Sequence, residues 1–365
     1  MLERTQGLHY DGSMSDVIAL ARALPKVVLH DHLDGSLRVQ TLFELLAARG
    51  LAAPAADVAG LARWFDARAH AGSLTQYLRG FDMTVAAMAS RAGLERVAFE
   101  AAEDARLDGA VLAEFRIAPL LFENHGLDGD SVVEALLAGL ARSPLPAGLI
   151  VCAMRHHPAS ESLRAARLAL RYQVRGVVAF DLAGPEAGHP PGDHAGALTL
   201  CRDAGLPLTL HAGEADAAER VVEAVQLGAQ RIGHGVRLVD ALADPMRRRL
   251  IDEVVASGVH LEVCPTSNLH TGAAMSMATH PITALWRAGV SLSYQTDNRL
   301  MSRISQSSEA QALLQHTTLS ATDLLQMGLQ AADHSFLTGA VRERARARLL
   351  EWASTAKLPL TSAAL

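Results

Sequence analysis

The sequence is poor in cysteine, with three in 365 residues. Cys152, Cys201 and Cys264 lie far apart and form no Cys-x-x-Cys pair, which argues against a disulfide framework and against a cysteine-based zinc or redox motif. Charges or histidines also interrupt every apolar run before about 18 residues, so no transmembrane helix is predicted. The segment from Met1 to Asp16 has charges and no apolar run, so no signal peptide is expected either. These absences predict a soluble protein of the reducing cytoplasm.

An excess of basic residues is also absent. The 33 Lys and Arg residues face 39 Asp and Glu residues, which gives a net charge of −6 and a pI of about 6.2. This balance argues against a nucleic-acid partner. Only Lys26 and Lys357 are lysines, a bias that we attribute to coding rather than to function. With half of its residues hydrophobic, the chain is expected to bury a sizeable core.

No internal repeat, low-complexity tract or flexible linker divides the chain, so a single domain over residues 1–365 is predicted. Short apolar runs alternate with longer helical patterns, as in a βα repeat with a parallel sheet. The runs rich in Val, Ile and Leu that we predict as strands are Val27–His32, Val111–Ala118, Leu149–Arg155, Gly176–Leu182, Pro207–His211, Arg231–His234, Val259–Val263 and Val290–Thr296.

Helical stretches lie between these runs. They are Ser160–Tyr172, Asp193–Ala204, Ala215–Leu227 and Pro245–Ser257. A glycine suited to a left-handed helix C-cap precedes the next strand at positions 205, 228, 258 and 289. The eightfold alternation predicts an α/β fold, a (β/α)₈ TIM barrel. Extra helices are expected between the first and second strands, over Leu37 to Gly109, and at the C-terminus.

Side chains able to bind metal follow several predicted strands. His30 and His32 end the first strand, where residues two apart point to the same side. Both imidazoles can therefore reach one metal ion. Two histidines at a strand end can equally make ordinary hydrogen bonds, so this pair alone does not decide between a metal site and a structural one.

Three later strands end in the same way. His211 and Glu214 follow the fifth, His234 lies between glycines at the end of the sixth, and Asp297 follows the eighth. Taken singly, each has an ordinary structural explanation, such as a buried histidine or a helix cap. Because a barrel gathers these strand ends at one mouth, their agreement predicts a metal-dependent active site.

Three imidazoles and one carboxylate suit Zn²⁺ or another borderline divalent ion. Such an ion with an open coordination position lowers the pKa of a bound water toward about 7, which predicts hydrolysis. In that case His234 would act as base or electrostatic guide for the water. Glu214 would donate a proton to the substrate.

The sequence resembles the adenosine deaminase family over nearly its whole length, from Pro25 to the helices after Asn298. The motifs that carry the resemblance stand in the family's order: residues 25–35 (PKVVLHDHLDG), 181–184 (DLAG), 211–214 (HAGE), 233–235 (GHG), 264–268 (CPTSN) and 296–298 (TDN). It is most similar to the actinobacterial type, which shares Glu-Ala-Gly-His-Pro-Pro after Gly184 and Asp-Asn-Arg-Leu-Met-Ser after the last strand.

The resemblance implies one zinc ion per chain, bound by His30, His32, His211 and Asp297. It also implies that Glu214 protonates purine N1. His234 would orient and deprotonate the zinc water, and Asp297 would accept from that water as well.

For the substrate, the resemblance implies that Asp34 and His32 hold the ribose 5′-hydroxyl and that the amide of Gly184 binds purine N3. Many family members have a second Asp where this chain has Asn298, a group that approaches purine N7. An asparagine amide donates a hydrogen bond at any pH, whereas a carboxyl donates only when it is protonated. Asn298 is therefore expected to bind N7 without acting as an acid.

Other reactive residue types receive no catalytic role. Cys264 is interpreted as a packed thiol, because no base follows it. His156, His157 and His189 are interpreted as structural.

The main hypothesis is hydrolysis of adenosine, and of 2′-deoxyadenosine, to the inosine product and ammonia. A deaminase of another 6-aminopurine, such as adenine or a futalosine-type nucleoside, is an alternative, although Asp34 favours a substrate with a 5′-hydroxyl. The other alternative, a non-catalytic binding protein on the same barrel, would be expected to have lost Glu214, His234 or a metal ligand. The expected partner is a small purine nucleoside, and no pattern sets the oligomeric state.

Overall fold

The computed structural model describes residues 14–69 and 74–358, and its described part contains a strand that overlaps each of the eight predicted runs. The absence of a signal peptide was predicted from Met1 to Asp16. Residues 1–13 of this segment lie outside the described residues. The strands are β1 (Lys26–Val28), β2 (Ala110–Ile117), β3 (Ala147–Met154), β4 (Val177–Ala183), β5 (Thr209–Ala212), β6 (Arg231–His234), β7 (His260–Val263) and β8 (Leu292–Tyr294).

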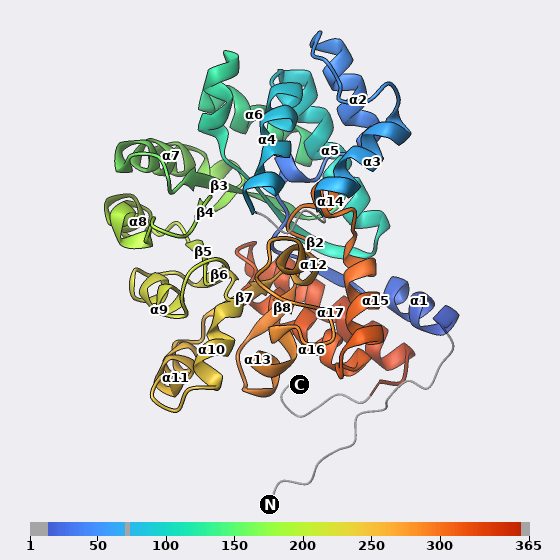
Figure 1. The fold of residues 1–365 in the computed structure, drawn as a ribbon, viewed down its shortest axis with the longest axis vertical. Helices are drawn as coiled ribbons and strands as arrows, with labels where there is room; N and C mark the ends of the chain where they lie inside the picture. Colours follow the sequence, from blue (N-terminus) through green and yellow to red (C-terminus); the bar gives the residue numbers. More distant parts are fainter. Residues whose placement is uncertain (1–13, 70–73, 359–365) are drawn as a thin grey trace, which may run out of the picture.

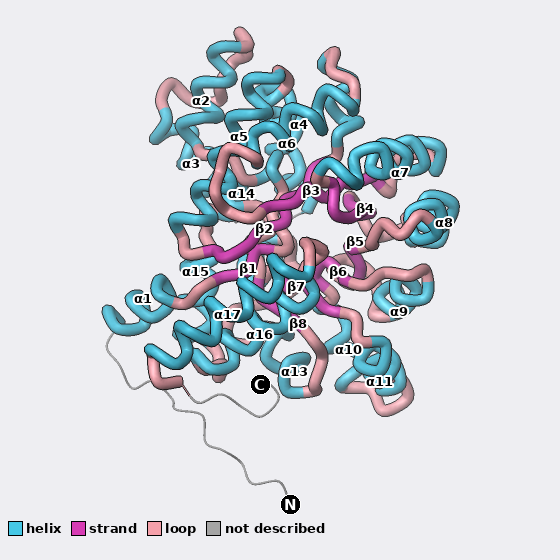
Figure 2. The backbone as a smooth tube through the Cα atoms, turned by 180° about the vertical axis from the view of Figure 1, so that it is seen from behind, coloured by secondary structure: helices cyan, strands magenta, loops and turns pink. Residues whose placement is uncertain are grey.

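The strands are parallel and form two four-stranded sheets, ordered β1-β2-β3-β4 and β5-β6-β7-β8. Isolated parallel bridges join the two sheets at both edges. Phe180 pairs with Leu208 at one seam, and Asp31 pairs with Asp297 at the other. Seen from behind, the strands form the centre of the molecule and the helices surround them (Figure 2). The predicted TIM-barrel fold is therefore confirmed.

Helices follow the strands around the barrel: α6 (Gly129–Leu140), α7 (Ala159–Tyr172), α8 (Ala195–Asp203), α9 (Glu219–Gln226), α10 (Val239–Leu242), α11 (Arg248–Ser257), α12 (Pro265–His270) and α13 (Pro281–Arg287). Short 3₁₀ helices occupy Leu33–Gly35, Pro119–His125, Gln173–Arg175, Pro191–His194 and Val236–Leu238. Each helical stretch predicted between strands contains an α-helix. The glycines predicted to end helices, at 205, 228, 258 and 289, all have positive φ.

The expected additional helices are present. Between β1 and β2 the chain forms α2 (Val39–Ala48), α3 (Val58–Ala69), α4 (Leu74–Met88) and α5 (Arg91–Leu107), which gather at the top of the molecule in Figure 1. After β8 it forms α14 (Arg299–Ser302), α15 (Gln306–His316), α16 (Ala321–His334) and α17 (Gly339–Thr355). Helix α1 (Met14–Ala23) precedes β1 and packs beside α15.

Most predicted boundaries shift by one to three residues in the structure. Two differ by four residues, and side chains explain both. β1 ends at Val28 instead of His32, because the side chain of Gln295 accepts a hydrogen bond from the Leu29 amide at 2.8 Å, where a neighbouring strand would otherwise pair. Helix α9 begins at Glu219 instead of Ala215. The carboxylate of Glu186 binds the backbone amides of residues 213–216 and keeps this segment out of the helix.

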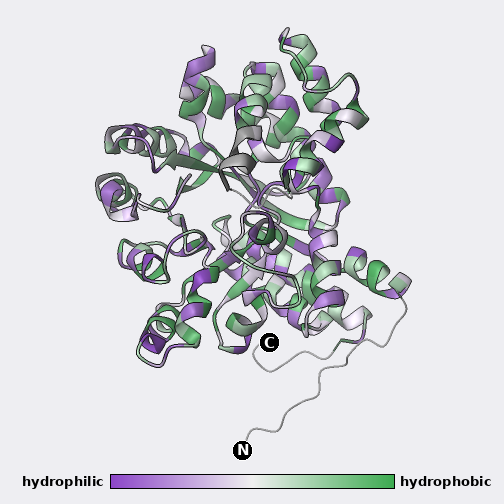
Figure 3. Cartoon of the chain, viewed as in Figure 1, coloured by the Kyte–Doolittle hydropathy of each residue, from purple (hydrophilic) through white to green (hydrophobic). Residues whose placement is uncertain are grey.

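The strands are buried along almost their whole length, and the core extends from them to the inward faces of the helices. The outer helices carry both hydrophilic and hydrophobic residues (Figure 3). Not all of the buried residues are apolar, since Glu114, Arg116, Arg231 and Glu262 lie on strands and are fully buried. Among the described helices, none is long and apolar enough to cross a membrane.

Candidate active site

Four buried side chains from different strand ends converge at the mouth of the barrel. One ligand atom from each of His30, His211, His234 and Asp297 lies within 4.8 Å of the others. His30 and Asp297 follow β1 and β8, while His211 and His234 lie at the ends of β5 and β6. The Nε2 atom of His30 is buried and points at Oδ1 of Asp297, 3.2 Å away, so this ring presents a nitrogen to the centre of the cluster.

His32 belongs to the same cluster. Its Nε2 atom lies 3.2 Å from Nε2 of His211 and 3.4 Å from Oδ1 of Asp297. Oδ1 of Asp297 is also 3.2 Å from Nε2 of His30. The structure thus brings together the four residues proposed as metal ligands, and three imidazoles with a carboxylate form a donor set that suits zinc.

The backbone at this seam of the barrel is constrained. Asp297 donates its amide to the carbonyl of His30 at 2.9 Å and accepts from the amide of His32 at 2.8 Å. Asp297 and His234 have φ values of 62° and 65°, which are unusual for residues other than glycine. Such strain persists only where the surrounding structure enforces it, and it concentrates at functional sites.

Gly233 provides the space in which two of the rings lie. A Cβ atom at this position would lie 2.9 Å from Cε1 of His30 and 3.3 Å from Cγ of His211. Any larger residue would therefore displace the histidines.

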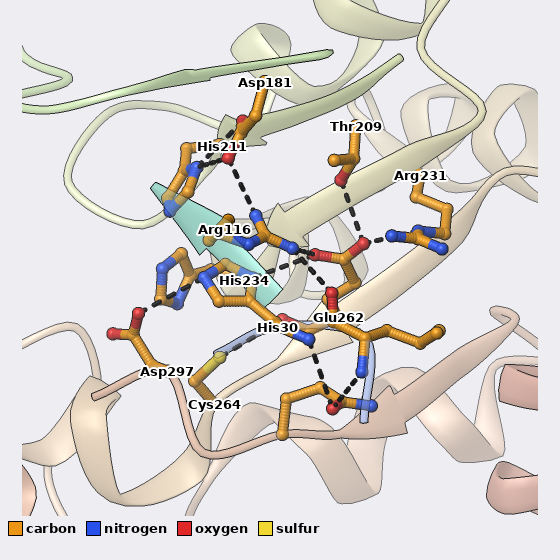
Figure 4. Close-up of polar contacts among 12 residues, drawn as sticks. His30, Arg116, Asp181, Thr209, His211, Arg231, His234, Glu262, Cys264 and Asp297 are labelled. Carbon is orange, nitrogen blue, oxygen red and sulfur yellow. Dashed lines mark hydrogen bonds and ion pairs between the residues drawn. The ribbon is translucent and has the colours of Figure 1, made fainter. Parts of the chain in front are cut away.

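Buried carboxylates contact two of the rings (Figure 4). Nδ1 of His30 lies 2.9 Å from Oε2 of Glu262, and Nδ1 of His211 lies 3.0 Å from Oδ2 of Asp181. Arg116 links the two carboxylates, because its guanidinium donates to Asp181 at 2.8 Å and to Glu262 at 2.6 Å. Carboxylates that accept from the second ring nitrogen of a metal-binding histidine fix its tautomer and orientation.

The electrostatics of the cluster suit a cation. Burial is the largest effect on the pKa of His32, which falls well below its usual value, and on the pKa of His211, which falls to about 4. Both rings are therefore neutral and able to coordinate metal. Burial opposes ionisation of Asp297, but contact with His30 and the nearby histidines hold its pKa well below the usual range. For His30, the adjoining carboxylates outweigh burial and raise the pKa, so this ring attracts a proton or a metal ion.

A cavity of about 370 Å³ opens above the cluster. Its lining includes every residue proposed for catalysis or substrate binding: His32, Asp34, Gly184, Glu214, His234, Asp297 and Asn298. Its walls otherwise come largely from apolar or small residues, among them Phe81, Ala118, Leu121, Cys152, Met154 and Ala183. A mostly apolar pocket with a few convergent polar groups is typical of a small-molecule site.

The residues proposed to bind substrate present unpartnered polar atoms in this region. Oδ1 of Asp34 and Oδ1 of Asn298 are both buried without a hydrogen-bond partner. Burial raises the pKa of Asp34 to about 7. The Asn298 side chain packs against Gly35, where a Cβ atom would lie 1.8 Å from its Oδ1. Gly184 has a φ of 97° and adjoins His156 and Met154.

Glu214 and His234 lie next to each other, with Oε2 of Glu214 3.5 Å from Nε2 of His234. Burial is the main reason why the pKa of Glu214 is raised. A raised pKa keeps more of the carboxyl protonated, as a general acid requires.

Sequence reasoning missed several residues that hold the site in place. The sequence does carry a signal for Arg116 and Glu262, because charged residues are uncommon in strands that are buried on both faces. Ser267 and Asn268 lie within a recognised motif but received no role. Ser267 donates to Asp297 at 2.6 Å, and the Asn268 amide lies 3.1 Å from Nδ1 of His234.

Cys264 and His156, two reactive residues without a predicted catalytic role, lie in different surroundings. Cys264 is fully buried, and burial raises the pKa of its thiol well above the usual value, as expected for a packed and unreactive group. His156, predicted to be structural together with His157 and His189, lines the cavity. The sequence pattern does not show that the loop after β3 turns this ring toward the mouth of the barrel.

Comparison with known proteins agrees with this geometry. The family model described as adenosine deaminase matches residues 25–352. The chain is 41% identical to the adenosine deaminase of Mycobacterium ulcerans over 332 residues, which cover 87% of this chain and 91% of the relative.

Two solved structures show the same fold. An adenine deaminase from Arthrobacter aurescens has a TM-score of 0.80 at 23% identity, covering 91% of this chain and 99% of its own. An amidohydrolase from Burkholderia ambifaria with bound Zn has a TM-score of 0.81 at 24% identity, covering 96% and 97%. Since the family match spans most of the sequence and five of the six motifs contribute residues to one cavity, the chain belongs to the adenosine deaminase family.

Proposed function

We propose that this enzyme hydrolyses adenosine, and also 2′-deoxyadenosine, to inosine or 2′-deoxyinosine and ammonia, in the cytoplasm. The observation that carries the proposal is the convergence of the buried His/Asp cluster with Glu214 in one cavity. Its relatives of about 41% identity are adenosine deaminases, which favours the same substrate.

Zinc is the proposed metal, with His30, His32, His211 and Asp297 as its ligands. The inward-facing Nε2 of His30, the neutral rings of His32 and His211 and the ionised Asp297 fit a borderline divalent cation. When bound there, zinc would lower the pKa of a coordinated water toward about 7 and so provide the nucleophile for attack on purine C6.

Side chains of the protein would accept and donate the protons in this reaction. His234 would orient the attacking water and accept its proton, with the carboxylate of Asp297 as a second acceptor. Glu214 would donate a proton to purine N1, which prevents negative charge from building up on the ring as C6 loses its aromatic character. The raised pKa of Glu214 supports this assignment.

The remaining polar groups would hold the nucleoside. The amide of Gly184 would donate to N3 and the amide of Asn298 to N7, while Asp34 and His32 would bind the 5′-hydroxyl. Oδ1 of Asp34 is buried and lacks a partner, so it requires a donor from the substrate. Free adenine offers no ribose hydroxyl for this position. Asp34 therefore favours a nucleoside over the base.

The test is ammonia release from metal-replete protein with adenosine, 2′-deoxyadenosine, adenine and adenosine monophosphate, followed by the change in ultraviolet absorbance. We expect turnover of the two nucleosides and little or none of adenine. Turnover of adenine alone would establish a different 6-aminopurine specificity. Absence of turnover with every compound would contradict the proposed function.

A further inference from the structure

One short segment contacts all three side chains proposed for catalysis. It consists of α12 and the residue that follows it, Thr271. The contacts are from Oγ of Ser267 to Asp297 at 2.6 Å, from Nδ2 of Asn268 to His234 at 3.1 Å, and from Oγ1 of Thr271 to Glu214 at 2.9 Å. This segment lies outside the proposed metal-ligand set.

The contact with Thr271 distinguishes the two carboxyl oxygens of Glu214. Thr271 donates its hydroxyl to Oε1, whereas Oε2 is the oxygen 3.5 Å from Nε2 of His234. Both Thr271 and Glu214 line the cavity. With Oε1 occupied by a donor, Oε2 is the oxygen left to carry and transfer a proton.

The backbone of Glu214 is held by other groups. Its amide donates to Glu186 at 2.9 Å, and its carbonyl accepts from Arg237 at 3.3 Å. Among the side chains that the structure describes, which exclude those of residues 70–79, the hydroxyl of Thr271 is the one group that donates a hydrogen bond to the carboxyl itself. The direction of that carboxyl therefore depends on Thr271 more than on the loop that carries it.

Thr271 is itself fixed by the segment. Its amide donates to the carbonyl of Ser267 at 2.9 Å, which closes the last turn of α12. At the other end of α12, Glu309 accepts from the amide of Thr266 at 3.2 Å. Glu309 is fully buried on α15, so the segment is tied to the body of the protein.

We infer that Thr271 is a positioning residue that holds Glu214 by Oε1 and directs Oε2 toward the reacting ring of the substrate. The inference rests on the proposed function, since it assigns the orientation of the proposed acid. Thr271 takes no proton and forms no bond to the substrate ring in this role. Its loss should therefore affect the chemical step more than substrate binding.

The test compares Thr271→Val with Thr271→Ser. Valine keeps the shape and removes the donor, whereas serine keeps the donor. Loss of a hydrogen bond to a charged group changes a rate or equilibrium constant by roughly tenfold or more. Thr271→Val should therefore lower kcat for adenosine by about that factor. KM should stay within about twofold, because ground-state binding is retained. Thr271→Ser should restore most of kcat, and Thr271→Ala should resemble Thr271→Val.

Thr279→Val is the matched control, because Thr279 is exposed in the same loop and its hydroxyl contacts Ser276. Metal content and thermal midpoint are measured for every variant. If the wild type is active and Thr271→Val and Thr271→Ser have the same kcat as the wild type, the inference is overturned and the proposed function stands. A rise in KM without a fall in kcat would also overturn it, since Thr271 would then bind substrate directly. A wild type that releases no ammonia would overturn the proposed function and this inference with it.

Discussion

Nδ1 of His30 lies 2.9 Å from Oε2 of Glu262, and both side chains are completely buried. Glu262 also accepts from Arg116 at 2.6 Å and from Arg231 at 2.6 Å. Burial opposes its ionisation, but the two guanidinium groups hold the pKa of Glu262 well below its usual range. The carboxylate therefore has two roles. It shares in the ion pairing of two buried guanidinium groups, which Asp181 and Glu114 also contact, and it fixes the orientation of a proposed metal ligand.

The change Glu262→Gln should lower both stability and metal affinity. It leaves Arg116 and Arg231 without this buried countercharge, and breaking a buried ion pair on one side costs about 3–5 kcal/mol of unfolding free energy. Loss of the orienting carboxylate should weaken metal binding by about 10- to 100-fold. Chemical denaturation and metal titration measure the two effects. Glu253→Gln on the exposed face of α11 should change neither, and similar values for both variants would contradict this role of Glu262.

The change Glu214→Gln should separate catalysis from binding. Glutamine keeps the shape of the side chain but has no proton to transfer, so turnover should fall by at least about 10²–10⁴. Metal content and the binding of substrate should be retained. Steady-state kinetics and elemental analysis check both statements, with the exposed Glu219→Gln as control. Turnover within about threefold of wild type would remove Glu214 from the mechanism.

The buried carboxyl of Glu309 should make stability depend on pH. Burial raises its pKa to about 8, whereas the carboxyl of an unfolded chain titrates near about 4.3. The folded protein therefore keeps a proton that the unfolded chain releases between these values. Its free energy of unfolding should fall as pH rises through this window, be undiminished below it, and level off above about pH 8.

Glu309→Gln removes this titration while keeping the shape of the side chain. The variant should gain stability relative to wild type as pH rises from about 5 to about 8.5, in denaturant unfolding of the metal-loaded protein. Glu253→Gln should follow the wild-type curve. A difference between Glu309→Gln and wild type that does not change with pH would mean that Glu309 does not titrate in this window.

Asn298 should make catalysis depend on purine N7. Without that acceptor, as in 7-deaza-adenosine, the amide donor would be left unpaired in a desolvated site at a cost of about 1–3 kcal/mol, and kcat/KM should fall accordingly. Asn298→Asp should be more sensitive to alkaline pH, because a carboxyl donates only when it is protonated. Equal processing of adenosine and the 7-deaza analogue, with superimposable pH profiles of the two enzymes, would show that Asn298 does not touch N7.

The sequence predicted the strands and the positions of the reactive groups well because both depend on local pattern. Apolar runs predicted all eight strands, and a parallel barrel places the residues that follow them at one mouth. His30, His32, His211, His234 and Asp297 could therefore be grouped before any contact was known, and the structure brings them together.

The residues that support this cluster could not be predicted in the same way. Arg116 and Glu262 are 146 positions apart, and their ion pair exists only because the closed barrel faces β2 toward β7. The late start of α9 depends on Glu186, which lies before β5 and is separated from α9 by that strand and by α8. Thr271 has no sequence signal at all, since its role comes from the path of the loop beyond α12. Contacts of this kind are set by tertiary packing and not by local propensity.

The most direct test of the account is to titrate metal-free protein with zinc while following ammonia release from adenosine. We expect no activity without metal and a linear rise to a plateau at about one zinc per chain, as one site with four protein ligands requires. His211→Ala, which removes one ligand, should lose both tight zinc binding and activity. Full activity in protein shown by elemental analysis to contain no metal would contradict the account.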